Sequence, residues 1–181
     1  MTYDSEAPLD TAVFAQLVTS TATRLGMELV VEPGRLLLGN AGILVTRVLD
    51  DKHSGGKDFL LTDAGMNDLL RPSHYNAFHR ISAVHEKAGA ALRRVDVVGP
   101  VCESGDYLGL DRELPLMEVG ELLAVWSSGA YGFCMSSNYN SRPRAAEILV
   151  DGDRFGVIRE RESFEDLVRN ERSEPRWRGG P

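Results

Sequence analysis

Residues 99–106 read Gly99-Pro100-Val101-Cys102-Glu103-Ser104-Gly105-Asp106. Gly-Pro at the start and Ser-Gly-Asp at the end are residue types that favour turns, so this stretch predicts a tight loop. The loop carries one thiol, Cys102, and one carboxylate, Glu103. A thiol can deliver a proton to carbon, and a carboxylate can bind an ammonium group. On its own, Cys102 is better explained as a small buried apolar residue, because most unpaired cysteines are buried; the residues around it favour the functional interpretation instead.

On both sides of this loop, short apolar runs alternate with Gly, Asp and Pro, a pattern typical of strands joined by turns. The turn Asp151-Gly152-Asp153 separates two of these runs and predicts a hairpin. Two short helices are also expected, at residues 74–80 and at residues 164–169, the second capped by Ser163. The predicted strands are residues 43–49, 58–63, 94–98, 122–127, 146–150 and 154–159.

The first 41 residues have a different pattern. Apolar side chains at positions 13, 14, 17, 18, 22 and 25 have the spacing of one helical face and predict a helix over 11–25. Residues 27–31 then predict a short buried strand that ends at Glu32-Pro33-Gly34. A helix, a strand and a glycine turn form one unit of an α/β barrel, and a short helix is expected next, over 36–41.

The expected fold class is therefore mixed α/β: a mainly antiparallel β-sandwich or barrel domain, preceded by the last helix-strand unit of a TIM-type barrel. We expect residues 1–41 to be that barrel remnant and residues 42–170 to be the β domain. Residues 171–181 are rich in Arg, Gly and Pro and predict a disordered tail.

Composition excludes several classes of function. The chain has 181 residues and a formal net charge of −7, which argues against a nucleic-acid partner. Its acidic start predicts no signal peptide, and no apolar stretch is long enough to span a membrane, so we expect a cytoplasmic protein. His74, His79 and His85 share no helical face and lack a completing ligand, so no metal site is expected.

The loop and three further blocks together resemble the diaminopimelate decarboxylases, pyridoxal-phosphate (PLP) decarboxylases with an alanine-racemase-type barrel. The resemblance extends from the loop through Leu114-Pro115, and the four blocks follow one another in the family's order over residues 28–167. The other blocks are Glu32-Pro33-Gly34-Arg35 with residues 40–48, Asp63-Ala64-Gly65-Met66 through Arg71-Pro72 and Tyr75, and Gly129-Ala130-Tyr131-Gly132 through Arg144.

This resemblance implies decarboxylation of meso-2,6-diaminopimelate to L-lysine with pyridoxal 5'-phosphate as cofactor, in lysine biosynthesis. It implies that Cys102 is the catalytic proton donor and that the loop reaches the active site of the partner subunit in a homodimer. The residues implied for cofactor binding are Glu32, Pro33, Gly34, Arg35 and Tyr131. Those implied for binding the small amino-acid substrate are Arg35, Arg71, Tyr75, Glu103 and Tyr131.

The family's Schiff-base lysine and its glycine triplet for the cofactor phosphate have no counterpart here. The three lysines, Lys52, Lys57 and Lys87, lie in or beside polar turns. We therefore expect the C-terminal portion of a longer decarboxylase, inactive alone. Two alternatives stay open: a non-catalytic dimerising or regulatory partner of an intact decarboxylase, and an inert remnant that does not fold alone.

Overall fold

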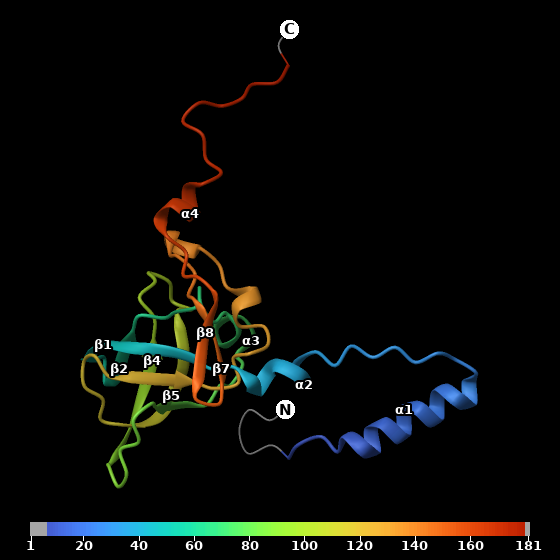
Figure 1. The fold of residues 1–181 in the computed structure, drawn as a ribbon. Helices are drawn as coiled ribbons and strands as arrows, with labels where there is room; N and C mark the ends of the chain where they lie inside the picture. Colours follow the sequence, from blue (N-terminus) through green and yellow to red (C-terminus); the bar gives the residue numbers. More distant parts are fainter. Residues whose placement is uncertain (1–6, 180–181) are drawn as a thin grey trace. The chain divides into compact units, whose positions relative to one another are not determined.

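The computed structural model describes residues 7–179 of the chain (Figure 1). The chain forms two compact units, one ending at Ser136 and one beginning at Ser137. The first unit contains a six-stranded sheet with short helices, and the second contains a two-stranded hairpin. A mixed α/β fold with a mostly antiparallel sheet is therefore confirmed. The first six residues and the last two, which belong to the predicted barrel remnant and tail, lie outside the described residues.

The six-stranded sheet has the order β3-β6-β1-β2-β4-β5. Its neighbouring strands are antiparallel, except that β2 and β4 run parallel. The edge strands β3 and β5 contact each other, and a Cβ on Gly109 would lie 3.0 Å from Cδ1 of Ile81. The sheet is therefore nearly closed, which leaves little unpaired edge. The strands are β1 (Leu44–Ser54), β2 (Lys57–Thr62), β3 (Ile81–Ala83), β4 (Leu92–Val98), β5 (Tyr107–Pro115) and β6 (Leu122–Val125).

The core lies inside this curved sheet. Central apolar side chains from five of the strands have no more than 1% exposure: Val48, Leu60, Val95, Val97, Leu108, Leu123 and Val125. Asp96, between the two buried valines of β4, is also buried, but it accepts hydrogen bonds from Lys57 Nζ at 3.1 Å and from the Asp111 backbone N–H at 2.7 Å. These partners satisfy a carboxylate that would otherwise be costly to bury.

Four strands of this sheet occur close to where the sequence predicts them, but β3 and β5 were not predicted. Strand β3 has only three residues, too few for an alternating pattern to be recognised. In β5, Gly109 and the charged run Asp111-Arg112-Glu113 interrupt the apolar pattern. The ladder to β4 and the contact with β3 supply the pairing that local propensity does not.

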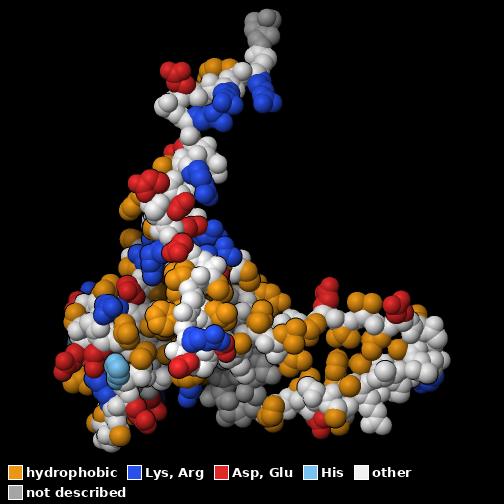
Figure 2. Space-filling model, viewed as in Figure 1, with side chains coloured by type: hydrophobic (Ala, Val, Ile, Leu, Met, Phe, Trp, Pro, Cys, Tyr) orange, Lys and Arg blue, Asp and Glu red, His pale blue; other side chains and the backbone are white. Residues whose placement is uncertain are grey.

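Helix α1 (Thr11–Leu25) forms as predicted, with Asp10 as its cap. Oδ1 of Asp10 accepts from the backbone N–H groups of Ala12 and Val13, each at 3.0 Å. Gly26 ends the helix in the left-handed conformation, with φ of 63°. The apolar side chains of α1 are exposed, and they gather with those of the segment that follows (Figure 2).

The predicted strand over residues 27–31 is wrong for this structure. No strand is assigned there, and Met27 and Val30 are 66% and 81% exposed. A strand needs a neighbour to accept and donate its backbone hydrogen bonds, and no strand in the described part of the chain pairs with this segment. The short helix predicted after it is present as α2 (Arg35–Leu38) and a 3₁₀ turn, η1 (Gly39–Ala41).

The helix predicted over residues 74–80 is also wrong in its position. The structure has α3 (Arg71–Tyr75), whose second residue is Pro72, and proline fits the first turn of a helix. Asn76 ends α3 in the left-handed conformation, with φ of 51°. Residues 77–80 then continue to β3 as irregular backbone.

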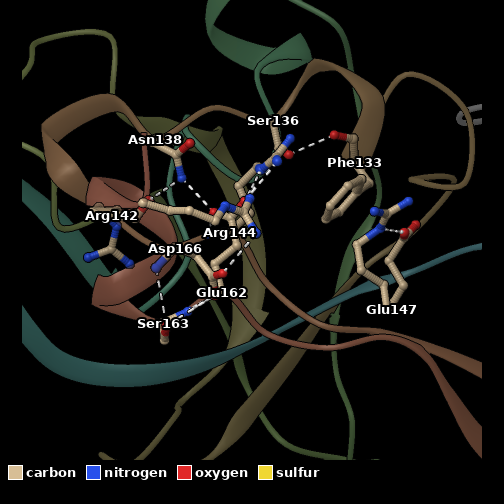
Figure 3. Close-up of polar contacts among 11 residues, drawn as sticks. Phe133, Ser136, Asn138, Arg142, Arg144, Glu147, Glu162, Ser163 and Asp166 are labelled. Carbon is tan, nitrogen blue, oxygen red and sulfur yellow. Dashed lines mark hydrogen bonds and ion pairs between the residues drawn. The ribbon is translucent and has the colours of Figure 1, made fainter. Parts of the chain in front are cut away.

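The second unit is organised around the predicted hairpin of β7 (Glu147–Asp151) and β8 (Arg154–Arg159), which turns at Gly152. At the open end of the hairpin, Arg144 pairs with Glu162 (Figure 3). Helix α4 (Phe164–Val168) starts with a capping box between Ser163 and Asp166, as the sequence predicts for its cap. The remaining elements are 3₁₀ turns, η2 (Phe133–Met135) in the first unit and η3 (Tyr139–Ser141) in the second.

Candidate functional site

A loop after β6 is joined to the turn after α2. The backbone N–H of Ser128 donates to the carbonyl of Gly42 at 2.8 Å, and that of Gly129 donates to the carbonyl of Gly39 at 3.1 Å. A Cβ on Gly129 would lie 2.0 Å from the carbonyl oxygen of Leu38. Only glycine therefore allows the two backbones to approach this closely. The contact fixes the start of the Gly129-Ala130-Tyr131-Gly132 turn.

Tyr131 is the residue that this turn presents. Its backbone has φ of 58°, a left-handed conformation that non-glycine residues adopt rarely. Its hydroxyl oxygen lies 3.6 Å from where a Cβ on Gly34 would stand. Gly34 also has a positive φ, 55°, and its neighbours Glu32, Pro33 and Arg35 are exposed. The structure thus places the Tyr131 hydroxyl beside Gly34.

Arg71 also lies close to Tyr131. Its Cζ is 5.9 Å from the centre of the Tyr131 ring and 5.8 Å from that of the Tyr75 ring. Arg71 is buried, whereas the two tyrosines are 43% and 58% exposed. A guanidinium at this distance from aromatic rings is attracted to their faces. Gly34, Tyr131, Arg71 and Tyr75 therefore form a cluster, which we call the Arg71 cluster.

The loop that carries Cys102 is held by Asp106. The two carboxylate oxygens of Asp106 accept from the backbone N–H groups of Met66 and Val101, each at 2.6 Å. A Cβ on Gly65 or on Gly99 would lie 2.5 Å from the Asp106 carboxylate, so both glycines are needed for it to fit. The anchor is buried and the loop tip is exposed, which leaves Cys102 and Glu103 accessible.

This loop lies beside α3. A Cβ on Gly105 would be 2.8 Å from Oγ of Ser73, the residue between Arg71 and Tyr75. The structure therefore places the Cys102–Glu103 loop next to the helix that supplies half of the Arg71 cluster.

The lysines are engaged elsewhere. Lys57 pairs with Asp96, and the hydrogen bond that its ammonium group donates to that carboxylate raises the pKa of Lys57. Lys87 donates to Glu121 Oε2 at 2.6 Å and to the Leu116 carbonyl at 2.8 Å. Lys52 lies on the exposed end of β1. None of the three belongs to the Arg71 cluster. In residues 7–179, no group of three His, Cys, Asp or Glu side chains is arranged to hold a metal ion.

His79 is a buried residue beside the cluster that the sequence analysis considered only as a metal ligand. It has no exposed surface, and its Nδ1 donates to the Trp126 carbonyl at 2.8 Å. Burial is the largest cause and lowers the pKa of His79; the hydrogen bond to the Trp126 carbonyl raises it in part, and the charges of Arg71 and Arg112 have smaller lowering effects. The alternation of His79 with Ile81 at the start of β3 was a signal for this burial.

The family model of the pyridoxal-dependent decarboxylase C-terminal sheet domain matches residues 1–129. The chain belongs to this family of pyridoxal-dependent decarboxylases.

The relatives that this chain matches have a more specific name than the family. The diaminopimelate decarboxylase of Aquifex aeolicus is 49% identical over 162 residues, which is 90% of this chain and 38% of the relative. That of Pseudomonas aeruginosa is 54% identical over 145 residues, 80% of this chain and 34% of the relative. The crystal structure of diaminopimelate decarboxylase from Helicobacter pylori complexed with L-lysine is 41% identical, with a TM-score of 0.85, and the match covers 93% of this chain and 41% of that one.

The chain thus spans about 40% of the length of the relatives it matches. Within residues 7–179, none of the helices combines the length and the apolar composition that crossing a membrane requires.

Proposed function

We propose that this chain supplies the sheet domain of a diaminopimelate decarboxylase, which converts meso-2,6-diaminopimelate to L-lysine and carbon dioxide in cytoplasmic lysine biosynthesis. The observation that carries the proposal is Arg71 between the rings of Tyr75 and Tyr131, with Gly34 against the Tyr131 hydroxyl. The identity of about 50% with proteins of that name supports the choice of substrate.

The Gly34–Tyr131 contact fits a pyridoxal-phosphate site. Gly34 leaves bare backbone beside a phenol, and its positive φ disfavours any side chain there, so a bulky anion can approach the main chain. Glu32, Pro33, Gly34, Arg35 and Tyr131 would hold the cofactor, which supplies an electron-withdrawing ring when bound. Because no lysine of this chain lies in the cluster, the lysine that binds the cofactor covalently would come from sequence outside these 181 residues.

The substrate has a carboxylate and an ammonium group far from the carbon that reacts. Arg71 can bind such a carboxylate through its planar guanidinium, and Arg35, Tyr75 and Tyr131 would orient the substrate. Glu103 would bind the distal ammonium. After carbon dioxide leaves, the thiol of Cys102 would deliver the proton to the α-carbon.

The same proposal assigns the remaining parts of the chain. The loop of Cys102 and Glu103 is exposed, which suits a role in the active site of a second subunit of a homodimer. Residues 1–41 would complete an α/β barrel, because the apolar side chains of α1 and of residues 27–31 are largely exposed. Residues 42–170 would be the sheet domain, and residues 171–181 a disordered tail.

A chimeric enzyme tests this function. The matching C-terminal part of the Aquifex aeolicus decarboxylase is replaced by this chain, and lysine formed from meso-diaminopimelate is measured. We expect turnover within about tenfold of the parent enzyme, because one general acid contributes at least about a hundredfold and would be retained. Cofactor absorbance and size-exclusion chromatography report whether the chimera is folded.

A folded, cofactor-binding chimera without turnover would contradict the proposal and favour the alternative, a non-catalytic dimerising or regulatory partner. The matched variants are Cys102→Ala, which should lose activity, and Cys134→Ala, which should keep it. Both cysteines are exposed and neither forms a disulfide, so the pair separates the loop thiol from a general loss of thiol.

A further inference from the structure

Two buried threonines hold the turn that follows β2. Thr46 on β1 is 1% exposed, and Thr62, the last residue of β2, is fully buried. The backbone N–H of Ala64 donates to the Thr46 hydroxyl oxygen at 3.0 Å, and the Ala64 carbonyl accepts from the Thr62 hydroxyl at 2.9 Å. Side-chain hydroxyls therefore bind both backbone hydrogen-bonding groups of Ala64.

An acid fixes the direction of the Thr46 hydroxyl. This hydroxyl donates to Oδ1 of Asp63 at 2.7 Å, and the same oxygen accepts from the Arg47 backbone N–H at 2.8 Å. An ionised carboxylate can only accept, so the Thr46 proton points to Asp63 and a lone pair faces the Ala64 N–H. Valine has the shape of threonine but offers neither donor nor acceptor. Thr46→Val would therefore remove the partner of a buried N–H group.

Thr62 also reaches the base of the Cys102 loop. Its hydroxyl lies 3.0 Å from the carbonyl oxygen of Val98, the last residue of β4, so it bridges the ends of β2 and β4. The residues that follow the two bridged carbonyls are Gly65 and Gly99. They are in direct contact, because a Cβ on Gly99 would lie 2.5 Å from the Cα of Gly65. The Thr62 hydroxyl thus holds the two segments together where their glycines meet.

The carboxylate of Asp106 occupies the space that these two glycines leave. It accepts from the backbone N–H groups of Met66 and Val101, each at 2.6 Å. Met66 belongs to the turn that the threonines hold, and Val101 directly precedes Cys102. The threonine hydroxyls, the turn at residues 64–66 and the Asp106 carboxylate therefore form one connected support for the backbone beside Cys102.

We propose that Thr46 and Thr62 are positioning residues for Cys102: their hydroxyls fix the turn at residues 64–66, on which Asp106 holds the loop. The role of Cys102 as the proton donor rests on the proposed function. The support of the loop by the two threonines is a property of the chain itself, and it can be measured without turnover.

The first test measures amide hydrogen exchange in the isotopically labelled 181-residue chain by NMR spectroscopy. Thr46→Val and Thr62→Val should each speed exchange of the Met66 and Val101 N–H groups by about two- to tenfold, the factor that one neutral hydrogen bond contributes. Thr46→Ser and Thr62→Ser keep the hydroxyl and should largely restore the wild-type rates. The two threonines are tested separately, so a variant that fails to fold leaves the other to decide.

The amides of residues 95–97, in the core of β4, are the internal reference for opening of the whole sheet. Leu114→Val is the matched control, because Leu114 is buried and pairs with Arg93 at the end of the β4–β5 ladder away from the loop. It should not speed exchange at Met66 and Val101 relative to the reference amides. Equal acceleration of all these amides in both valine variants would overturn the proposal, and so would unchanged exchange at Met66 and Val101.

The second test uses the chimeric decarboxylase. A displaced proton donor slows the step that it serves, so Thr62→Val should lower kcat for meso-diaminopimelate by about tenfold or more, with unchanged cofactor absorbance. Thr62→Ser should restore kcat. In a Cys102→Ala background, Thr62→Val should cause little further loss, because residues that act through the same group have non-additive effects.

The outcomes separate this inference from the proposed function. Losses of kcat that multiply in full in the double variant, or an unchanged kcat in a folded Thr62→Val enzyme, would overturn the link to Cys102. If the chimera has no activity at all, the proposed function fails. The exchange rates of Met66 and Val101 then decide alone whether the two threonines support the loop.

Discussion

The Arg144 guanidinium donates to Oε1 of Glu162 through both Nε, at 2.9 Å, and Nη2, at 2.7 Å (Figure 3). The other oxygen, Oε2, accepts from the Arg144 backbone N–H at 2.8 Å and from the Asn138 amide at 2.6 Å. These bonds join the chain just before β7 to the chain just after β8. They lower the pKa of Glu162 to about 2, with the Arg144 side chain as the largest cause.

The hairpin should therefore become less stable as the pH falls into the acid range. The folded-state pKa of Glu162 lies below its ordinary value of 4.5, so the unfolded hairpin binds the proton first as pH falls. The stabilisation is complete above about pH 4.5 and should be lost progressively down to about pH 2. Amide hydrogen exchange of β7 and β8 measures this loss.

In Glu162→Gln, the acid dependence should disappear, and the hairpin should be less stable at pH 7 by about 1–2 kcal/mol, since a partly exposed charge-assisted network is lost. Glu171→Gln, at an exposed residue of the tail, is the control and should have no such effect. A Glu162→Gln hairpin that keeps the wild-type pH dependence would assign the transition to another group.

Replacement of Asp106 should release the loop of Cys102. In Asp106→Asn, an amide N–H must face either the Met66 or the Val101 N–H, which leaves a buried donor unpaired. We expect a loss of about 1–3 kcal/mol in unfolding free energy and faster modification of Cys102 by a thiol reagent.

The measurement is made in a Cys134→Ser background, so that only one exposed thiol reacts. Asp153→Asn, in the exposed hairpin turn, serves as the control and should leave both quantities unchanged. Equal thiol reactivity in Asp106→Asn and the parent would show that other contacts fix the loop.

Addition of one methyl group at Gly129 should disrupt the Arg71 cluster. The new Cβ would lie 2.0 Å from the Leu38 carbonyl, so the two loops must separate. Overpacking of this kind costs about 1–3 kcal/mol. Gly156→Ala is the matched control, because a Cβ there meets nothing within 4 Å and its φ is not positive. Thermal unfolding compares the two, and equal melting temperatures would contradict the close approach.

Arg71→Ala in the chimera should lower kcat/KM for one of two substrates much more than for the other. Meso-diaminopimelate has a distal carboxylate that lysine lacks, so only the former loses an ion pair, and its kcat/KM should fall about tenfold to a hundredfold. Activity on lysine, where detectable, should change much less. Arg94→Ala, at an exposed arginine of β4, is the control. An equal fall for both substrates would mean that Arg71 serves the structure or the cofactor.

The strands that are bounded by turn residues such as Gly, Asp and Pro could be predicted from the sequence. Strands β3 and β5, which depend on pairing with distant strands, could not. Helix α1 has its own cap and its own periodicity, and the hairpin has its own turn. Strand β3 exists because Ile81 and Ala83 pair with Val125 and Leu123, about 40 residues later, and no local signal contains that information. Residues 27–31 show the opposite case. Their local pattern predicts a strand, but no strand forms there because no neighbouring strand pairs with them.

The site shows the same division. Family motifs pointed to Tyr131, Arg71, Tyr75 and Gly34, and the structure brings these four together. The role of Asp106 depends on which backbone atoms its side chain reaches across the fold, at Met66 and Val101. Sequence spacing does not encode those contacts, so Asp106 was assigned no role beforehand.

The pairing of β6 has a kinetic consequence. This strand lies between β3 and β1, so Val125 pairs on one side with Ile81 and on the other with Leu44. Both ladders close long loops. The chain must therefore lose conformational entropy before the contacts between these strands can stabilise it. The loop that presents Tyr131 follows β6 directly, and Arg71 lies within one of the closed loops. A partly folded chain would therefore lack the arginine–tyrosine arrangement entirely, so ligand affinity should appear only in the last and slowest phase of refolding.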